Sequence, residues 1–361
     1  MRQSTTRVLA SVVLIAIEVA CGDNTAADEP ATGSSGPLGS SDGVTSSANG
    51  TVEDSAGAGS TSMASDMPGG ELSTTTETAE DAGDDVSLDL PPQQDCSGYA
   101  NVYMGSFAAD DDDDVATLAG VTCIEGDLAL RMDVTDLSDL LDLEAVGSIQ
   151  FSTLDLVSFD GLDSLREIRR TLSFGAYLPD AGCVEMQIAT IAPLAALEEL
   201  GELFVCNNPN LTSIAELETA LTGDFPGPIH IVSAPSLQSL DGLQGLTSAG
   251  HGLALTDLPL VPDLEPLGNL GSVEGSFTLG GLTSLTSLEG LEQVTHAGSL
   301  LIVGNAQLTT LAGFDNLAAV GENLSIHDNP MLPHDEAEAW AAALDVGTTI
   351  TICNNLGGPP C

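Results

Sequence analysis

Histidine and acidic residues gather near the C-terminal end of this sequence, and side chains of these types bind metal ions. His327 is followed by Asp328, and the run His334-Asp335-Glu336 comes shortly afterwards. The spacing matches no known metal motif, and Pro330 and Pro333 separate the two groups. We therefore interpret them as turn residues and a helix cap, and we predict no metal site and no cofactor.

Seven cysteines are the second set of reactive residues. Cys21 follows an apolar N-terminal segment, and six lie further along. An even number in an exported chain favours disulfides, although six cysteines allow fifteen pairings. No C-x-x-C spacing of the kind typical of structural zinc sites is present in the sequence. The six are Cys96, Cys123, Cys183, Cys206, Cys353 and Cys361.

The sequence contains no motif typical of an enzyme. It has no G-x-S-x-G nucleophile elbow, and no glycine-rich phosphate loop lies between a strand and a helix. We predict no catalytic residues and a protein that is not an enzyme. The enzyme alternative would require a compact cluster of histidines and carboxylates with perturbed pKa values.

A repeat of about 23 residues must position all of these side chains. The segments that begin at Gly275 and Gly298 both open with a glycine, continue with a short strand, and place leucines at matching offsets. An apolar-x-apolar triplet recurs ten times and predicts strands that stack as a parallel sheet. The sequence therefore predicts a mainly β, right-handed parallel solenoid of about ten coils. The triplets begin at Leu128, Ile149, Leu172, Leu203, Ile229, Leu253, Phe277, Leu300, Leu324 and Ile350.

Glycines before the strands and polar residues after them suggest how the coils turn. Gly126, Gly147, Gly252, Gly275 and Gly298 suit a turn with positive φ. Asparagine and aspartate side chains after the strands are expected to bond turn backbone groups. These polar residues are Asn207, Asn208, Asn305, Asp328, Asn329 and Asn354.

Irregular segments interrupt or cap the coils. Residues 215–222 and 334–344 are expected to be helical, and the second segment would pack Trp340 onto the last coils. Residues 177–185 are expected to form an insertion. Each coil of a solenoid contacts only its neighbours, which favours pairing of cysteines close in sequence. The expected pairs are Cys96 with Cys123, Cys183 with Cys206, and Cys353 with Cys361.

The first twenty residues have the pattern of an export signal. Arg2 and Arg7 flank the start of a largely apolar segment that is too short to span a bilayer. The segment Val19-Ala20-Cys21-Gly22 resembles the lipobox of bacterial lipoproteins. That resemblance implies a lipidated Cys21 and attachment to the membrane by its acyl chains. Ordinary signal cleavage that leaves a spare thiol is the alternative.

Residues 21–95 and residues 96–361 differ sharply in composition. The first region is rich in Ser, Thr, Gly and Ala, and it contains acidic residues but no basic ones. Such a composition cannot bury enough apolar surface to fold, so we expect a disordered tether. The second region contains the repeat and is expected to form the solenoid. Within it, the acidic run Asp110–Asp114 lacks the alternating ligands of a calcium loop, and we expect a solvated loop.

The outward-facing residues of the ten strands define a candidate ligand face. The chain has a formal net charge of −48, which argues against nucleic acid as a partner. The outward row is nevertheless free of acidic residues, and Phe204, His230 and Leu301 are its larger members. Docking on this face and a plain preference for β-forming residues both remain open. The cluster Arg166, Arg169 and Arg170 either pairs with Glu167 and other acids or forms an anion-binding patch.

The segment Cys123-Ile124-Glu125-Gly126-Asp127-Leu128, preceded by Cys96, resembles the start of the receptor L domain of insulin-receptor and EGF-receptor type proteins. The later coils resemble L-domain-like repeats of bacterial surface lipoproteins and fungal cell-wall proteins. The resemblance covers residues 96–361 and implies a non-catalytic recognition or adhesion surface for a protein or glycan at the cell envelope. Lipid anchoring would place it at the outer membrane or cell surface. A structural envelope protein without a discrete ligand is the alternative.

Overall fold

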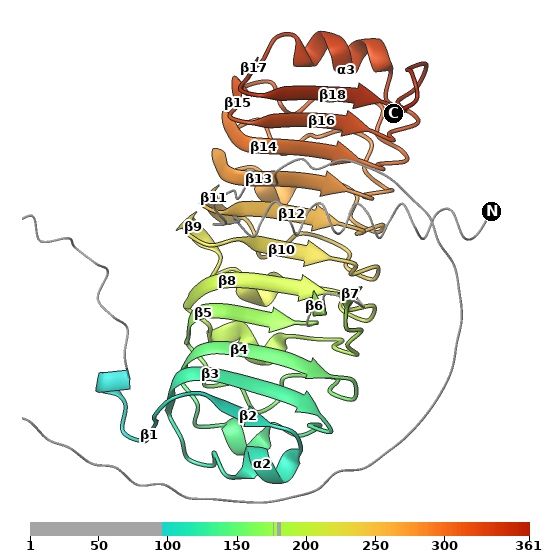
Figure 1. Cartoon of the computed structure of the whole chain (residues 1–361). Helices are drawn as coiled ribbons and strands as arrows, with labels where there is room; N and C mark the ends of the chain where they lie inside the picture. Colours follow the sequence, from blue (N-terminus) through green and yellow to red (C-terminus); the bar gives the residue numbers. More distant parts are fainter. Residues whose placement is uncertain (1–95, 176, 179–181) are drawn as a thin grey trace, which may run out of the picture. The chain divides into compact units, whose positions relative to one another are not determined.

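The computed structural model describes residues 96–175, 177–178 and 182–361, and there the chain forms one stack of parallel β-coils (Figure 1). The predictions for the signal peptide 1–20, for Cys21 and for the tether 21–95 lie outside the described residues. In the described part, no helix is long and apolar enough to cross a membrane.

The ten expected strands all form, and they pair in parallel at the expected register, which confirms the predicted fold class. Leu128 pairs with Ile149, and the same position continues strand by strand to Ile350. One further strand, β2 (Phe107–Ala109), pairs with β3 ahead of the first expected coil. The ten strands are β3 (Cys123–Met132), β4 (Ala145–Thr153), β5 (Glu167–Phe174), β8 (Glu199–Cys206), β10 (Ile229–Val232), β12 (Gly252–Thr256), β13 (Ser272–Gly280), β14 (His296–Val303), β16 (Asn323–His327) and β18 (Thr349–Cys353).

A second parallel ladder lies at the beginning of each coil. The sequence pattern does not predict it. It joins the first residues of the longer strands to short separate strands, and all of them belong to one 16-stranded sheet. The register shifts between the two ladders, for example between Val273 and Ser276. The short strands are β1 (Val102–Tyr103), β9 (Thr222–Phe225), β11 (Gly245–Ala249), β15 (Ala319–Val320) and β17 (Asp345–Val346).

The glycines at this shift are needed for close approach between coils, which corrects the positive-φ expectation. Of the five named glycines only Gly252, at φ 132°, has a positive φ. A Cβ added to Gly275 would lie 2.2 Å from the His251 carbonyl oxygen. A Cβ added to Gly298 would lie 2.2 Å from the Glu274 carbonyl oxygen. The preceding coil thus fills the space that any side chain would need.

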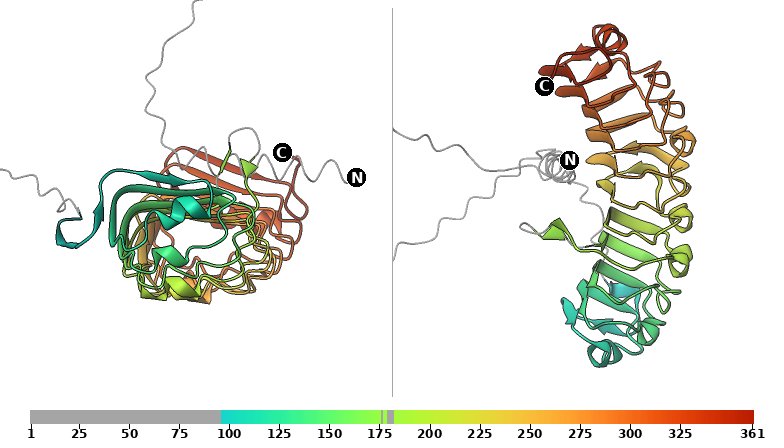
Figure 2. Two further views of the ribbon diagram at one scale, coloured as in Figure 1. Left: turned by 90° about the horizontal axis from the view of Figure 1, so that it is seen from below. Right: turned by 90° about the vertical axis from the view of Figure 1, so that its right-hand side faces the viewer.

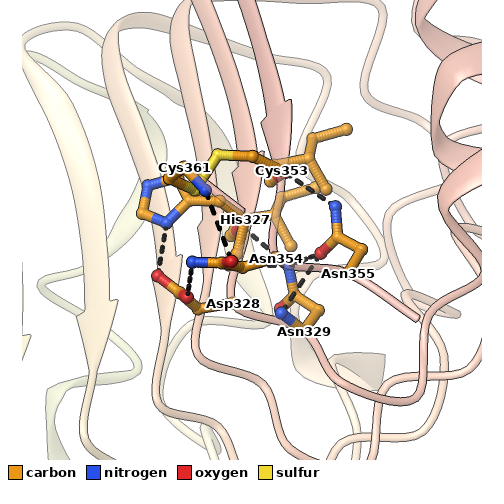
Figure 3. Close-up of a disulfide and its surroundings, with 9 residues drawn as sticks. His327, Asp328, Asn329, Cys353, Asn354, Asn355 and Cys361 are labelled. Atoms are coloured by element: carbon orange, nitrogen blue, oxygen red, sulfur yellow. Dashed lines mark hydrogen bonds and ion pairs between the residues drawn. A yellow bond between two sulfur atoms is a disulfide. The ribbon is translucent and has the colours of Figure 1, made fainter. Parts of the chain in front are cut away.

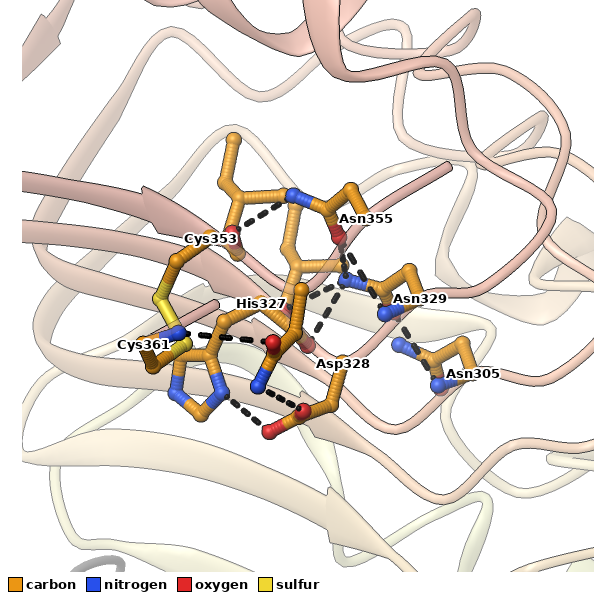
Figure 4. A network of polar contacts seen from close by, with 10 residues as sticks. Asn305, His327, Asp328, Asn329, Cys353, Asn355 and Cys361 are labelled. Atoms are coloured by element: carbon orange, nitrogen blue, oxygen red, sulfur yellow. Dashed lines mark hydrogen bonds and ion pairs between the residues drawn. A yellow bond between two sulfur atoms is a disulfide. The ribbon is translucent and has the colours of Figure 1, made fainter. Parts of the chain in front are cut away.

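Buried asparagines bind neighbouring coils together after the strands (Figure 4). The Asn329 side chain accepts a hydrogen bond from the Asn305 backbone N–H at 3.0 Å and donates to the Ile302 carbonyl at 3.1 Å. The Asn355 side chain repeats both contacts one coil later, with the Asn329 N–H and the Ile326 carbonyl. Asparagine therefore satisfies backbone groups that would otherwise be buried without partners.

The predicted helices are partly confirmed. The helix α3 (His334–Ala341) buries Ala337 and Ala341, and its Trp340 ring lies 5.9 Å from that of Phe314. Only the short helix η4 (Ala215–Leu217) forms in the other segment, because the chain enters β9 soon afterwards. The other short helices are η1 (Cys96–Gly98), η2 (Ser138–Leu140), η3 (Ala192–Ala196) and η5 (Glu265–Leu267).

The acidic run forms a helix start, so the loop expectation was wrong. Asp111 caps the helix α2 (Asp112–Ala116) by accepting a hydrogen bond from the Asp114 N–H. Asp112 accepts hydrogen bonds from the backbone N–H groups of Thr135 and Asp136 in the next coil. Carboxylates are favourable at a helix N-terminus because they meet unpaired N–H groups there.

Three disulfides join the cysteines in the expected sequential pairs: Cys96 with Cys123, Cys183 with Cys206, and Cys353 with Cys361. Cys183 belongs to β7 (Gly182–Cys183), which pairs with β6 (Tyr177–Leu178) in an excursion from the coil stack. Figure 3 shows the last disulfide beside the strand end of β16.

Candidate functional site

The outward residues of the strands form one continuous row across the concave side of the coil stack, where the longer strands lie in Figure 2. Strand register places these residues beside one another, since Phe204 pairs with His230 and Thr278 with Leu301. The row contains no acidic side chain in a chain of net charge −48. Its members are Ala129, Gln150, Ser173, Phe204, His230, Ala254, Thr278, Leu301, Ser325 and Thr351.

A groove of about 560 Å³ lies over the N-terminal half of this row, between β3 and β10. Five residues of the row line it: Ala129, Gln150, Ser173, Phe204 and His230. A second set of side chains lines it from positions two residues before each of these five in the sequence. These are Asp127, Ser148, Thr171, Glu202 and Pro228.

The two acidic side chains that line the groove, Asp127 and Glu202, both have hydrogen-bond partners. Arg170 donates a hydrogen bond to Asp127, and the two form an ion pair that is about half exposed. Hydrogen bonding from Ser148, with a contribution from Arg170, lowers the pKa of Asp127. Glu202 accepts a hydrogen bond from the Thr171 hydroxyl at 2.7 Å. The groove therefore presents hydrogen-bonding groups and ion-paired side chains around an aromatic wall.

Phe204 and His230 form that wall. Their ring centroids lie 5.9 Å apart and their planes cross at 69°, an edge-to-face arrangement. His230 is only 9% exposed. Burial lowers the pKa of His230, and the nearby Glu202 carboxylate opposes that effect. The imidazole is therefore neutral at neutral pH, and the wall carries no charge.

Leu301 belongs to the same row but not to the groove. It lies on β14, and β12 and β13 separate that strand from β10. Strands in a sheet are about 4.8 Å apart, which places Leu301 roughly 14 Å from His230. The structure thus brings two of the three predicted ligand-face residues together and leaves the third outside.

The arginine cluster is occupied with local partners. Arg166 pairs with Glu198 at 3.0 Å, and Arg170 pairs with Asp127. Arg169 donates to the Ile124 carbonyl at 2.8 Å and lies against the Cys96–Cys123 disulfide. Of the two alternatives for this cluster, pairing with nearby acids describes Arg166 and Arg170, although with other acids than Glu167.

The histidine and acid cluster near the C-terminus contains the one group of three potential metal ligands found among the described residues. His327, Asp328 and Cys361 offer atoms within 4.8 Å of one another. The His327 Nδ1 is hydrogen-bonded to the Asp328 carboxylate at 2.8 Å (Figure 3), and the Cys361 sulfur is bonded to Cys353. A disulfide sulfur is not a thiolate ligand. His334 begins α3 and pairs with Glu338 instead.

The groove residues that the sequence reading missed have a simple signal. The apolar-x-apolar triplet identifies only its central residue as outward-facing. The residue two positions earlier points to the same face of the strand, because side chains alternate with period two. Applying that step to the triplets would have found Asp127, Ser148, Thr171 and Glu202.

No comparison with known proteins assigns this chain to a family, so its class is defined by the fold. No family model matches the chain, and no curated protein matches it. A solved structure of an internalin, InlF, from Listeria monocytogenes shows 17% identity over 67% of this chain and 76% of that chain, with a TM-score of 0.33. A likeness at that level carries no argument about function. The register of the strands defines this chain as a parallel β-solenoid protein with a grooved concave sheet.

Proposed function

We propose that the chain is a non-catalytic recognition or adhesion protein of the bacterial cell envelope, which binds a protein or glycan in the groove between β3 and β10. The observation that carries this proposal is the neutral aromatic wall of Phe204 and His230 on the concave face of an otherwise acidic molecule. Aromatic rings combined with a few oriented polar groups are typical of ligand sites.

The groove also has the polar groups needed for orientation. Gln150 is exposed, and Ser173, which is 8% exposed, lies in register between Gln150 and Phe204. The Thr171 hydroxyl and the Glu202 carboxylate are held together at 2.7 Å. A sugar or a peptide backbone would find both donors and acceptors here without displacing a strong ion pair.

The proposed setting is outside the cytoplasm, with the solenoid attached through a lipid on Cys21 and the tether 21–95. Three disulfides support an oxidising compartment, because such bonds are rare in reducing cytosol. Lipidation of Cys21 is a proposal that mass spectrometry of the mature N-terminus would test. The expected result is a diacyl or triacyl group on Cys21, and an unmodified residue would refute the anchor.

The groove is tested by binding to a glycan array and to envelope proteins from the native cells. Phe204→Ser should lose binding, whereas Leu301→Ser, a matched change on the same row outside the groove, should retain it. Equal binding by both variants would refute the groove as the binding site. Circular dichroism of both variants checks that neither has unfolded.

A further inference from the structure

The last strand, β18, leaves an open edge at the C-terminal end of the coil stack (Figure 1). Within the described part of the chain it pairs with β16 alone. The inner position of each coil is fully buried until this strand, since Leu300 and Leu324 are 1% and 0% exposed. Ile350 occupies the same position and is 50% exposed, because no later coil of the described residues covers it. The helix α3 lies nearby, yet Thr349 and Thr351 also remain exposed.

This edge is uncharged in a strongly acidic protein. Residues 346–361 contain no acidic, basic or histidine side chain, whereas the whole chain has a net charge of −48. Long exposed strand edges are usually blocked by charged residues or by proline, which prevent pairing with other strands. The sequence Thr349-Ile350-Thr351-Ile352-Cys353 contains neither device. The edge is therefore free to pair, and no like charges meet along the edge itself when two copies approach.

The sequence of β18 is complementary to itself. In an antiparallel pair centred on Thr351, Thr351 faces its own copy, and Ile350 faces Ile352 of the second strand. Thr–Thr and β-branched pairs are favourable across antiparallel strands. Ile350 and Ile352 point to the inner side of the sheet, where pairing would cover the half-exposed Ile350. A charged partner strand would find no side chain of opposite sign along this edge.

We propose that two copies of the chain associate through β18, in antiparallel register about a two-fold axis at Thr351. The axis is perpendicular to the sheet, so the two sheets join into one and both concave faces point the same way. The dimer would then present two grooves to one surface, with the joined C-terminal coils between them. Two linked sites bind a multivalent surface more tightly than one.

The test is the molar mass of the purified full-length chain by light scattering over a range of concentrations. Light scattering measures molar mass independently of molecular shape. The expected mass rises with concentration to twice the 36.7 kDa of one chain. A mass that stays at one chain at the highest soluble concentration would overturn the proposal.

Charge substitutions at Thr351 test the register. Thr351→Glu and Thr351→Lys each place like charges opposite one another, and each should weaken self-association at least about tenfold. An equimolar mixture of the two variants should restore dimers, because Glu then faces Lys. Thr283→Glu, at an exposed threonine of another coil, should leave association unchanged. Persistent dimers in both Thr351 variants, or no restoration in the mixture, would overturn the proposal.

Discussion

Replacing Asn329 with alanine should destabilise the C-terminal coils more than any surface change near them. The side chain is 0% exposed. It accepts from the Asn305 N–H at 3.0 Å and donates to the carbonyls of Ile302 and His327 at 3.1 and 3.0 Å. Alanine removes these bonds and leaves the Asn305 N–H buried without its acceptor.

The expected size of the effect follows from those contacts. A buried backbone group without a partner costs about 1–3 kcal/mol, and each lost hydrogen bond contributes about 1 kcal/mol. Asn329→Ala should therefore lower the free energy of unfolding by roughly 3–5 kcal/mol. Asn316→Ala is the matched control, because its side chain is exposed and makes one hydrogen bond, to the Glu292 carbonyl. The control should cost less than about 1 kcal/mol.

Urea unfolding followed by tryptophan fluorescence measures this difference locally. The chain has a single tryptophan, Trp340, which packs beside Phe314 in the last coils. In a solenoid each coil depends on its neighbours, so this signal reports on the end that contains Asn329. If Asn329→Ala and Asn316→Ala shift the unfolding midpoint equally, the asparagine ladder does not stabilise the coils and the reasoning fails.

Three other predictions follow from the same structure. Gly275→Ala should lower the unfolding free energy by about 1–3 kcal/mol, because its Cβ would meet the preceding coil. Gly271→Ala is the control: its Cβ would lie at an ordinary contact distance, 3.5 Å from the Thr247 carbonyl oxygen, and it should be nearly neutral in the same urea assay. Burial lowers the pKa of His230, so the unfolded chain binds more protons than the folded chain, and stability falls as the pH drops through about 6.5. His230→Gln should therefore reduce the loss of stability between about pH 7.5 and pH 5.5. If the variant loses as much stability between these two pH values as the unchanged protein, the prediction is contradicted. Arg169→Ala should cost more stability than Arg170→Ala. Arg169 donates a hydrogen bond to a buried carbonyl, whereas the ion pair of Arg170 is half exposed and contributes about 0–1 kcal/mol. A larger fall in thermal stability for Arg170→Ala than for Arg169→Ala would contradict this order.

The strands and disulfides could be predicted because both depend on short-range rules. Alternating apolar residues such as Leu300 and Ile302 specify a half-buried strand, and repetition specifies stacking. Once coils contact only their neighbours, Cys183 can pair with Cys206 but hardly with Cys353. The sequence does not predict the strand β2, because only one of its residues, Phe107, is large and apolar.

The second ladder and the groove depend on contacts between coils that a linear pattern does not display. The sequence suggests that Gly275 is a turn residue, but glycine is required there because the His251 carbonyl oxygen leaves no space for a side chain. Arg170 reaches Asp127 across two coils. The acidic run from Asp110 has the composition of a solvated loop, but Asp112 accepts a hydrogen bond from the turn of the next coil. These contacts follow from the coil register, which the structure supplies.

The claim on which the functional proposal depends most is that the solenoid faces the outside of the cell. Protease treatment of intact and lysed native cells, followed by detection of the folded region, tests it directly, since exposed flexible segments are cleaved first. The proposal predicts that intact cells lose the solenoid into the medium through cleavage in the tether. Loss only after lysis would contradict display on the surface and would exclude adhesion to external partners.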